Sequence, residues 1–125
     1  MLVLLLRLAW IVGFLVGTTT HTIDLLAGGL DVYAGYPDGI RLYWVSLTVL
    51  DPLTVALIAL RQRAGVVLGV AIMVSDVTIN LTVSAVYGGL GVSGLIFQAA
   101  FAVLVLSTAP LLWRSSRHRP AGIEG

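Results

Sequence analysis

Residues 65–87 read GVVLGVAIMVSDVTINLTVSAVY, an apolar stretch that contains a single charged side chain, that of Asp76. A helix needs about 20 mostly apolar residues to cross a bilayer, so this stretch is long enough to span a membrane. A charged Asp near the middle of a span costs on the order of 3 kcal/mol, and such a residue usually faces protein or a wet cavity. The stretch therefore predicts a transmembrane helix with a functional group inside the bilayer.

Three further segments on either side of this stretch have the same length and character, and basic or turn-forming residues separate them. A chain of 125 residues suits one compact domain. The sequence therefore predicts an all-α integral membrane four-helix bundle over residues 1–113, followed by a basic, disordered cytoplasmic tail at 114–125. The predicted helices cover about residues 2–26, 40–60, 65–87 and 92–113.

The composition excludes several classes of protein. Hydrophobic residues make up 58% of the chain and charged residues only 10%, whereas soluble domains carry about a quarter charged residues. A net charge of +1 gives no reason to expect nucleic acid as a partner. The chain has no cysteine, and His21 is the one histidine within a predicted span. We therefore predict no metal site and no cofactor.

The arginines predict the orientation of the bundle. Basic residues that flank membrane spans accumulate on the cytoplasmic side. With four spans, one side of the membrane collects every arginine except Arg41, and this is the side of both termini. We therefore expect cytoplasmic N- and C-termini, in a location that we expect to be the inner (plasma) membrane of a bacterium. The arginines on the cytoplasmic side are Arg7, Arg61, Arg63, Arg114, Arg117 and Arg119.

Polar side chains within the spans fall on shared helical faces. At about 100° per residue, Gly13, Gly17, His21 and Asp24 lie on one stripe of the first span. A second stripe, in the third span, contains Gly65, Gly69, Asp76, Asn80 and Tyr87, and a third, in the second span, contains Trp44, Thr48, Asp51 and Val55.

The first and third spans both begin their stripe with G-x-x-x-G, a spacing that lets helix backbones approach closely in membranes. We expect these two helices to touch in the cytoplasmic half and to separate in the outer half around a polar pocket. The predicted ligand-binding residues of this pocket are His21, Asp24, Trp44, Asp51, Asp76, Asn80 and Tyr87.

The charges predicted inside the bundle do not balance. The carboxylates of Asp24, Asp51 and Asp76 have one candidate cation, His21. Buried anions without partners favour a bound proton or a cationic ligand. If the site is catalytic, its candidates are these same residues, His21, Asp24, Asp51 and Asp76, although the sequence leaves open whether a reaction takes place.

Each of these residues also has a purely structural interpretation. His21 and Asp24 can form a hydrogen-bonded pair, and Asp76 with Asn80 can join neighbouring helices. Asp51 precedes Pro52, which removes a backbone hydrogen bond, so the carboxylate can compensate for a kink. Gln98, in the fourth span, is interpreted as a packing hydrogen bond.

Two short motifs resemble the EXPERA group, which contains the sigma-2 receptor and the emopamil-binding sterol isomerases. They are His21-Thr22-Ile23-Asp24-Leu25 at the end of the first span and Asp51-Pro52 in the second. The resemblance implies a helical membrane protein with cytoplasmic termini and an acidic pocket, in which Asp24 and Asp51 pair with a cationic ligand or a carbocation-like intermediate. Asp76 and Asn80 depart from the pattern of that group.

Three functions remain open on the sequence. The first, which we favour, is binding, with or without isomerisation, of a lipophilic polyprenyl- or steroid-like molecule that carries a positive charge in some cases. The second is a proton- or cation-coupled transporter that works as a homo-oligomer. The third is an accessory subunit of a larger membrane complex. The lipid bilayer is a partner in all three.

Overall fold

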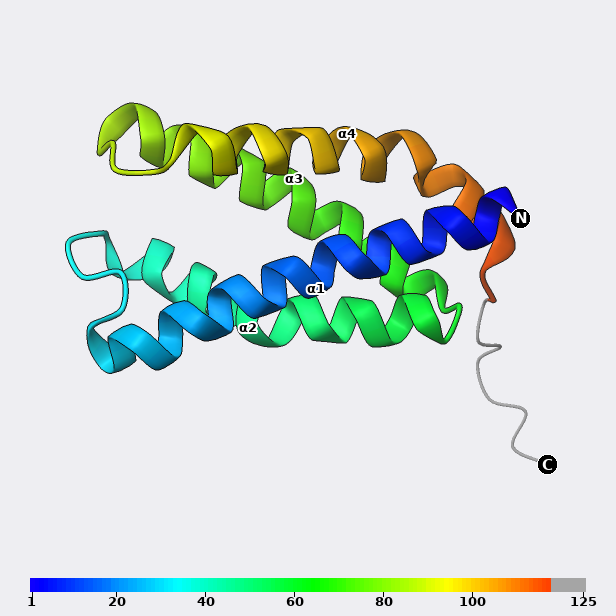
Figure 1. The fold of residues 1–125 in the computed structure, drawn as a ribbon, viewed down its shortest axis with the longest axis horizontal. Coiled ribbons are helices and arrows are strands. Elements are labelled where there is room, and N and C mark those ends of the chain that lie inside the picture. Colours follow the sequence, from blue (N-terminus) through cyan, green and yellow to red (C-terminus); the bar gives the residue numbers. More distant parts are fainter. Residues whose placement is uncertain (118–125) are drawn as a thin grey trace.

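The fold is an antiparallel bundle of four α-helices, shown by the computed structural model, which describes residues 1–117 (Figure 1). All four helices are long and apolar enough to cross a membrane, so the predicted all-α, four-helix architecture is confirmed. The helices are α1 (Leu2–Gly28), α2 (Asp38–Ala59), α3 (Arg63–Val86) and α4 (Val92–Ser115), with a short 3-10 helix η1 (Gly29–Asp31) after α1.

The two ends of the bundle differ. The N-terminus, the turn between α2 and α3, and residues 115–117 lie together at one end, which we call the terminal end. The connections 29–37 and 87–91 lie at the other, which we call the loop end. All described arginines except Arg41 therefore belong to the terminal end.

The predicted start of a disordered tail at residue 114 was wrong, because α4 continues to Ser115. The backbone of Arg117 then pairs with the α2–α3 turn: its N–H donates to the Arg61 carbonyl at 2.6 Å, and its carbonyl accepts from the N–H of Arg63 at 3.3 Å. These bonds hold the chain against the bundle. The rest of the predicted tail, residues 118–125, lies outside the described residues.

Hydrogen bonds and aromatic packing hold α1 to its neighbours at the terminal end. The guanidinium of Arg7 is buried, and it donates to the Ile58 carbonyl at 3.0 Å and to Ser115 Oγ at 2.9 Å. One turn further along α1, Trp10 Nε1 donates to Thr108 Oγ1 at 2.9 Å. These bonds join α1 to both α2 and α4.

The expected close approach of the first and third helices is not present. No Cα atom of α1 lies within 8 Å of one of α3. The G-x-x-x-G of α1 instead places Gly13 against the Phe101 ring of α4 and Gly17 against Asp51 of α2, while Gly69 of α3 packs on the rings of Trp10 and Phe14. These two large rings occupy the space between α1 and α3 and keep the backbones apart.

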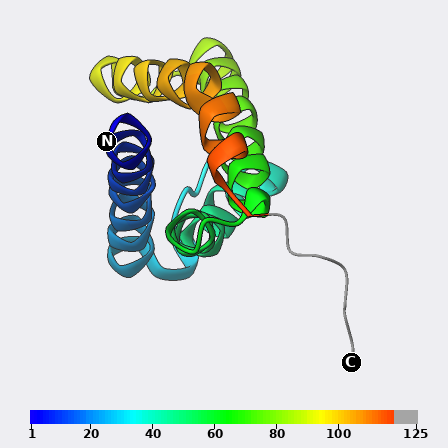
Figure 2. The same ribbon diagram turned by 90° about the vertical axis from the view of Figure 1, so that its right-hand side faces the viewer.

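The helices α1 and α4 separate towards the loop end. The two helices lie close at the terminal end, and α1 then runs obliquely away from α4 (Figure 1). Seen from the terminal end, α1 and α4 are the first and last members of a ring in which α2 and α3 lie between them (Figure 2). Counted from the terminal end, the last aromatic contact between α1 and α4 is that of Phe14 with Phe101, whose ring centroids lie 5.3 Å apart. This separation creates the space for the site.

Candidate functional site

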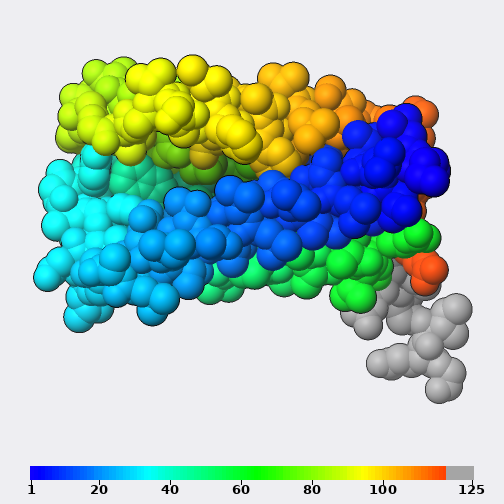
Figure 3. Space-filling model, in the orientation of Figure 1, coloured from blue at the N-terminus to red at the C-terminus, as the bar shows by residue number. Residues whose placement is uncertain are grey.

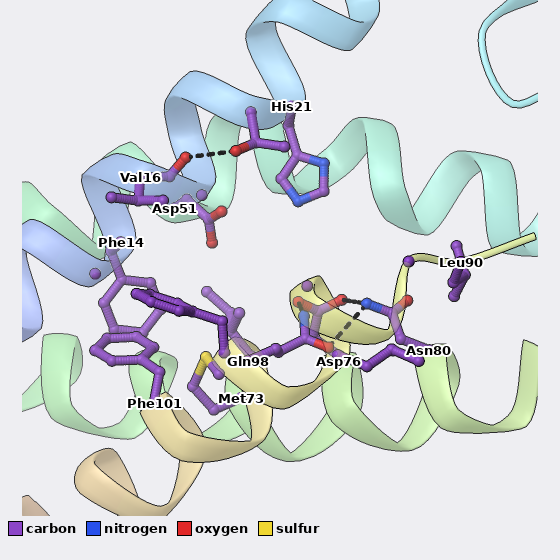
Figure 4. Close-up of a pocket in the computed structure, with 18 residues that line it drawn as sticks. Phe14, Val16, His21, Asp51, Met73, Asp76, Asn80, Leu90, Gln98 and Phe101 are labelled. Atoms are coloured by element: carbon purple, nitrogen blue, oxygen red, sulfur yellow. Dashed lines mark hydrogen bonds between the residues drawn. The ribbon is translucent and has the colours of Figure 1, made fainter. Parts of the chain in front are cut away.

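A cavity of about 600 Å³ lies between α1, α3 and α4, with Asp51 of α2 on its wall. Most of its lining is apolar, including Phe14, Met73 and Phe101. Polar groups come from a small number of positions on all four helices, and Figure 4 shows how they surround the space. These polar residues are Thr20, His21, Asp51, Asp76, Asn80 and Gln98.

The cavity opens on the side of the bundle, between α1 and α4. Its lining includes side chains that are exposed on the outer surface: Val16 of α1 is 51% exposed and Phe97 of α4 is 74% exposed. Gly94, also exposed, contributes no side chain to this edge. The surface is hollowed between the two helices (Figure 3). The opening therefore lies on the lateral face of the bundle.

Asp51 is the buried acid without full hydrogen bonding. Its side chain is 4% exposed, and Oδ1 has no hydrogen-bond partner among the described residues. The carboxylate lies against the backbone of α1, because Oδ2 is only 2.6 Å from the position that a Cβ on Gly17 would occupy. Because Gly17 has no side chain, the Asp51 carboxylate can lie against α1 at the wall of the cavity. An unpaired charge in such surroundings is costly unless a cation or a proton joins it.

Asp76, by contrast, has hydrogen bonds to both carboxylate oxygens. Asn80 Nδ2 donates to Oδ1 at 3.2 Å, and Gln98 Nε2 donates to Oδ2. Asn80 also donates to Gln98 Oε1 at 3.0 Å and accepts from Trp44 Nε1 at 2.8 Å. The four residues, which we call the Asp76 network, join α2, α3 and α4. This arrangement favours the structural interpretation of Asp76 and Asn80, and also that of Gln98.

His21 projects from α1 into the cavity, one turn beyond Gly17, and Figure 4 shows its ring pointing towards the space between Asp51 and Asp76. Its Nδ1 lies 3.3 Å from the hydroxyl of Tyr33, which donates to Asp24 Oδ2 at 3.0 Å. The interpretation of His21 and Asp24 as a bonded pair therefore needs a correction: Tyr33, from the connection 29–37, stands between them.

Aromatic rings cover the loop end of the bundle. Trp44 contacts Tyr33 and Tyr36 edge-on, with centroid distances of 4.9 and 5.0 Å. Tyr36 in turn contacts Tyr87 at 6.0 Å. At the opposite side, the rings of Phe14 and Phe101 bound the cavity towards the terminal end. The lateral opening between α1 and α4 is thus the direct route from the surface to the cavity.

The structure brings together part of the residue set predicted from the sequence. His21, Asp51, Asp76 and Asn80 line the cavity. Asp24, Trp44 and Tyr87 do not: Asp24 accepts from Tyr33, Trp44 donates to Asn80, and Tyr87 is 54% exposed at the loop end. A helical face fixes a direction but not the depth of a side chain, so the stripes could not separate these three residues from those that line the cavity.

Sequence reasoning missed two kinds of residue at the site. Phe14, Phe101 and Met73 shape the apolar part of the cavity, but in an apolar span nothing distinguishes them from lipid-facing neighbours. Tyr33 has a backbone φ of 60°, an uncommon conformation for a residue other than glycine. No local pattern in the connection predicts the turn that directs its hydroxyl towards His21.

Among residues 1–117, no arginine lines the cavity that holds Asp51 and Asp76. The ion pair found within residues 1–117 joins Arg41 to Asp38 at 3.5 Å, at the loop end. In the same range, no three His, Cys, Asp or Glu side chains gather as metal ligands would. In comparisons with protein-family models, curated proteins and solved structures, nothing matches this chain. The site must therefore be interpreted from its own chemistry.

Proposed function

We propose that this chain is an integral membrane protein whose cavity binds a lipophilic molecule with a basic or cationic group. The four apolar helices support insertion into a bilayer, and the arginines at the terminal end support cytoplasmic termini. A bacterial inner membrane remains our expected location. The proposal agrees with the ligand chemistry that the EXPERA resemblance implies.

The observation that carries this proposal is the state of Asp51. Its carboxylate is buried at an apolar cavity that no arginine or lysine among residues 1–117 lines, and one of its oxygens is unpartnered. A protonated amine would supply both the missing charge and the missing hydrogen bond. The volume of about 600 Å³ lies within the 300–1,000 Å³ that is common for small-molecule sites.

The shape of the site supports entry from the lipid. Aromatic rings cover the loop end, whereas the lateral opening has apolar residues such as Val16 and Phe97 at its edge. In a membrane, this opening would face the acyl chains. Isomerisation of the bound molecule would require an acid and a base in contact with it, and His21 and Asp51 are the residues of the cavity that are suited to these roles.

Asp51→Asn is expected to abolish most of the affinity for a long-chain amine. Removing one partner of a buried charge pair costs 2 kcal/mol or more, so the dissociation constant of dodecylamine should rise about 30-fold or further. The measurement is equilibrium binding of radiolabelled dodecylamine to the protein in nanodiscs, with empty nanodiscs subtracted.

The matched control for this experiment is Asp31→Asn, which removes the same charge from an exposed position in η1. Unchanged dodecylamine affinity in Asp51→Asn would contradict the proposal. If proton flux into liposomes were then found and were lost in Asp51→Asn, the transporter hypothesis would replace it. Copurification with fixed partner proteins, together with no amine binding, would favour an accessory subunit.

Gly94→Trp tests the lateral opening. A Cβ on Gly94 meets no atom within 4 Å, so the large side chain can extend over the opening without disturbing the fold. We expect dodecylamine to bind about tenfold more weakly, a loss near 1.4 kcal/mol. Gly39→Trp, at an equally open position outside the cavity, is the control and should bind normally. Equal affinities in the two variants would place the entry elsewhere.

A further inference from the structure

The hydrogen bonds behind His21 determine what its ring can offer to the cavity. The Tyr33 hydroxyl has one proton, and it donates that proton to Asp24 Oδ2 at 3.0 Å. Burial raises the pKa of Tyr33, and the hydrogen bond to Asp24 raises it further, so the hydroxyl keeps its proton. Towards His21 Nδ1, at 3.3 Å, the tyrosine oxygen is then left with its lone pairs.

An acceptor at Tyr33 requires a donor at His21. In a neutral imidazole one ring nitrogen carries the proton and the other is an acceptor. A nitrogen whose neighbour can only accept must carry the proton, so the hydrogen-bond partner of one nitrogen fixes the tautomer. Nδ1 of His21 must therefore carry the proton. Its Nε2 is left with a free lone pair, on the edge of the ring that points into the cavity (Figure 4).

The cavity then presents acceptors where a ligand head would lie. Asp51 rests against Gly17, and His21 follows one turn later on the same face of α1. The oxygens of Asp76, across the space, already accept from Asn80 and Gln98. Two groups with unused acceptor capacity, one carboxylate and one imidazole nitrogen, thus face the cavity from neighbouring positions.

We propose that Tyr33 and Asp24 hold His21 as its Nδ1–H tautomer, so that Nε2 and the Asp51 carboxylate together select a ligand head that bears at least two N–H donors. This inference rests on the proposed binding function and narrows its ligand class. A primary or secondary ammonium has the two donors, and a quaternary ammonium of the same charge has none. Tyr33 is a positioning residue, because it acts through His21 and does not line the cavity.

The tautomer can be measured directly. His118 is the only other histidine in the chain, so in a His118→Gln background the ¹⁵N NMR signals of labelled histidine report His21 alone. We expect a protonated Nδ1 and an unprotonated Nε2. Tyr33→Phe should convert the ring to a mixture or to the Nε2–H tautomer. A protonated Nε2 in the parent protein, or an unchanged tautomer in Tyr33→Phe, would overturn the inference.

Tyr36→Phe is the matched control for the same spectrum. Tyr36 lies in the same connection and also packs on Trp44, but its hydroxyl bonds to the Gly88 carbonyl and not to His21. Its loss should leave the His21 signals in place. A change common to both variants would indicate a general disturbance of the connection and would contradict a specific role for Tyr33.

Selection of the ligand head is tested with two amphiphiles of equal chain length. N-methyldodecylamine should bind about 100-fold more tightly than dodecyltrimethylammonium, the effect of two charge-assisted hydrogen bonds, one to Asp51 and one to His21 Nε2. In His21→Leu this preference should fall about tenfold, because only the hydrogen bond to Asp51 then remains, while binding of both amphiphiles still depends on Asp51. Equal binding in the parent protein with intact Asp51 dependence would overturn the selection but not the proposed function. If neither amphiphile bound, the selection of the ligand head and the proposed function would both be overturned.

Discussion

Asp76→Leu is expected to lower the free energy of unfolding by about 2–4 kcal/mol, because it leaves two half-buried amide donors without acceptors. Asn80 and Gln98 both donate to this carboxylate, and their bonds connect α3 with α4. Leucine has a similar size and suits the apolar surroundings, so packing alone would not explain such a loss. The measurement is the unfolding transition in detergent micelles, monitored by tryptophan fluorescence, to which Trp44 contributes.

Asp51→Leu is the matched control for Asp76→Leu. It also removes a buried acid from a helix interior, but Oδ1 of Asp51 has no partner to lose. Its stability should be equal to that of the parent protein or higher, while dodecylamine binding disappears. If Asp51→Leu were the more destabilised variant, the assignment of one acid to structure and the other to ligand binding would be reversed.

The double variant Asp76→Leu/Gln98→Leu gives a second check. Replacing both partners of a buried hydrogen bond by apolar groups is far less costly than removing one of them. The second substitution should therefore cost less than Gln98→Leu does alone, because it removes an amide that has already lost its acceptor, although it also takes Gln98 Oε1 from Asn80. If the losses of unfolding free energy in the two single variants simply added in the double variant, a direct hydrogen bond between these side chains would be contradicted.

Gly65→Ala is expected to have the second large effect, about 2–3 kcal/mol of destabilisation, as overpacking typically produces. A Cβ at this position would lie 2.9 Å from the backbone nitrogen of Ile58 and 2.8 Å from the Leu57 Cβ. Backbone atoms cannot move aside as a flexible side chain can. The start of α3 would have to shift away from the end of α2, and the Arg7 bond to the Ile58 carbonyl would be disturbed.

The control for Gly65→Ala is Gly94→Ala, in the first turn of α4. No atom lies within 4 Å of the added Cβ, and alanine is the better helix former by about 1 kcal/mol. We expect a small gain in stability or no change. The same unfolding measurement serves for both variants, and equal midpoints for the two would show that the α2–α3 contact tolerates the methyl group.

Hydropathy was sufficient to predict the elements but not their neighbours. The four helices begin and end within about two residues of the predicted bounds, since long apolar runs and the arginines or glycines between them fix where a helix can exist. A stripe of glycines on a helix indicates that another segment packs closely on that face, but it does not identify the segment. In α1, that partner is Phe101 for Gly13 and Asp51 for Gly17, and the bulk of Trp10 and Phe14 prevents the expected contact with α3.

The sequence was sufficient to predict which polar groups the site contains, but not which of its acids are hydrogen-bonded. The positions of His21, Asp51 and Asp76 within apolar spans were enough to place polar groups in one interior space. Whether each acid is satisfied depends on Gln98, which comes from a different helix, and on the backbone turn at Tyr33. Such contacts between distant segments leave no pattern in a single sequence.

The Arg7 guanidinium, bonded to both α2 and α4, has a consequence for motion. It divides α1 into a segment fixed from two sides and a segment, beyond Phe14, that is fixed mainly by α2. Widening of the lateral opening then amounts to bending or tilting of the distal part of α1, with the proximal turns as a stationary base. Amide exchange along this one helix would rise from the residues near Arg7 to those near His21, and a bound amine would reduce that gradient.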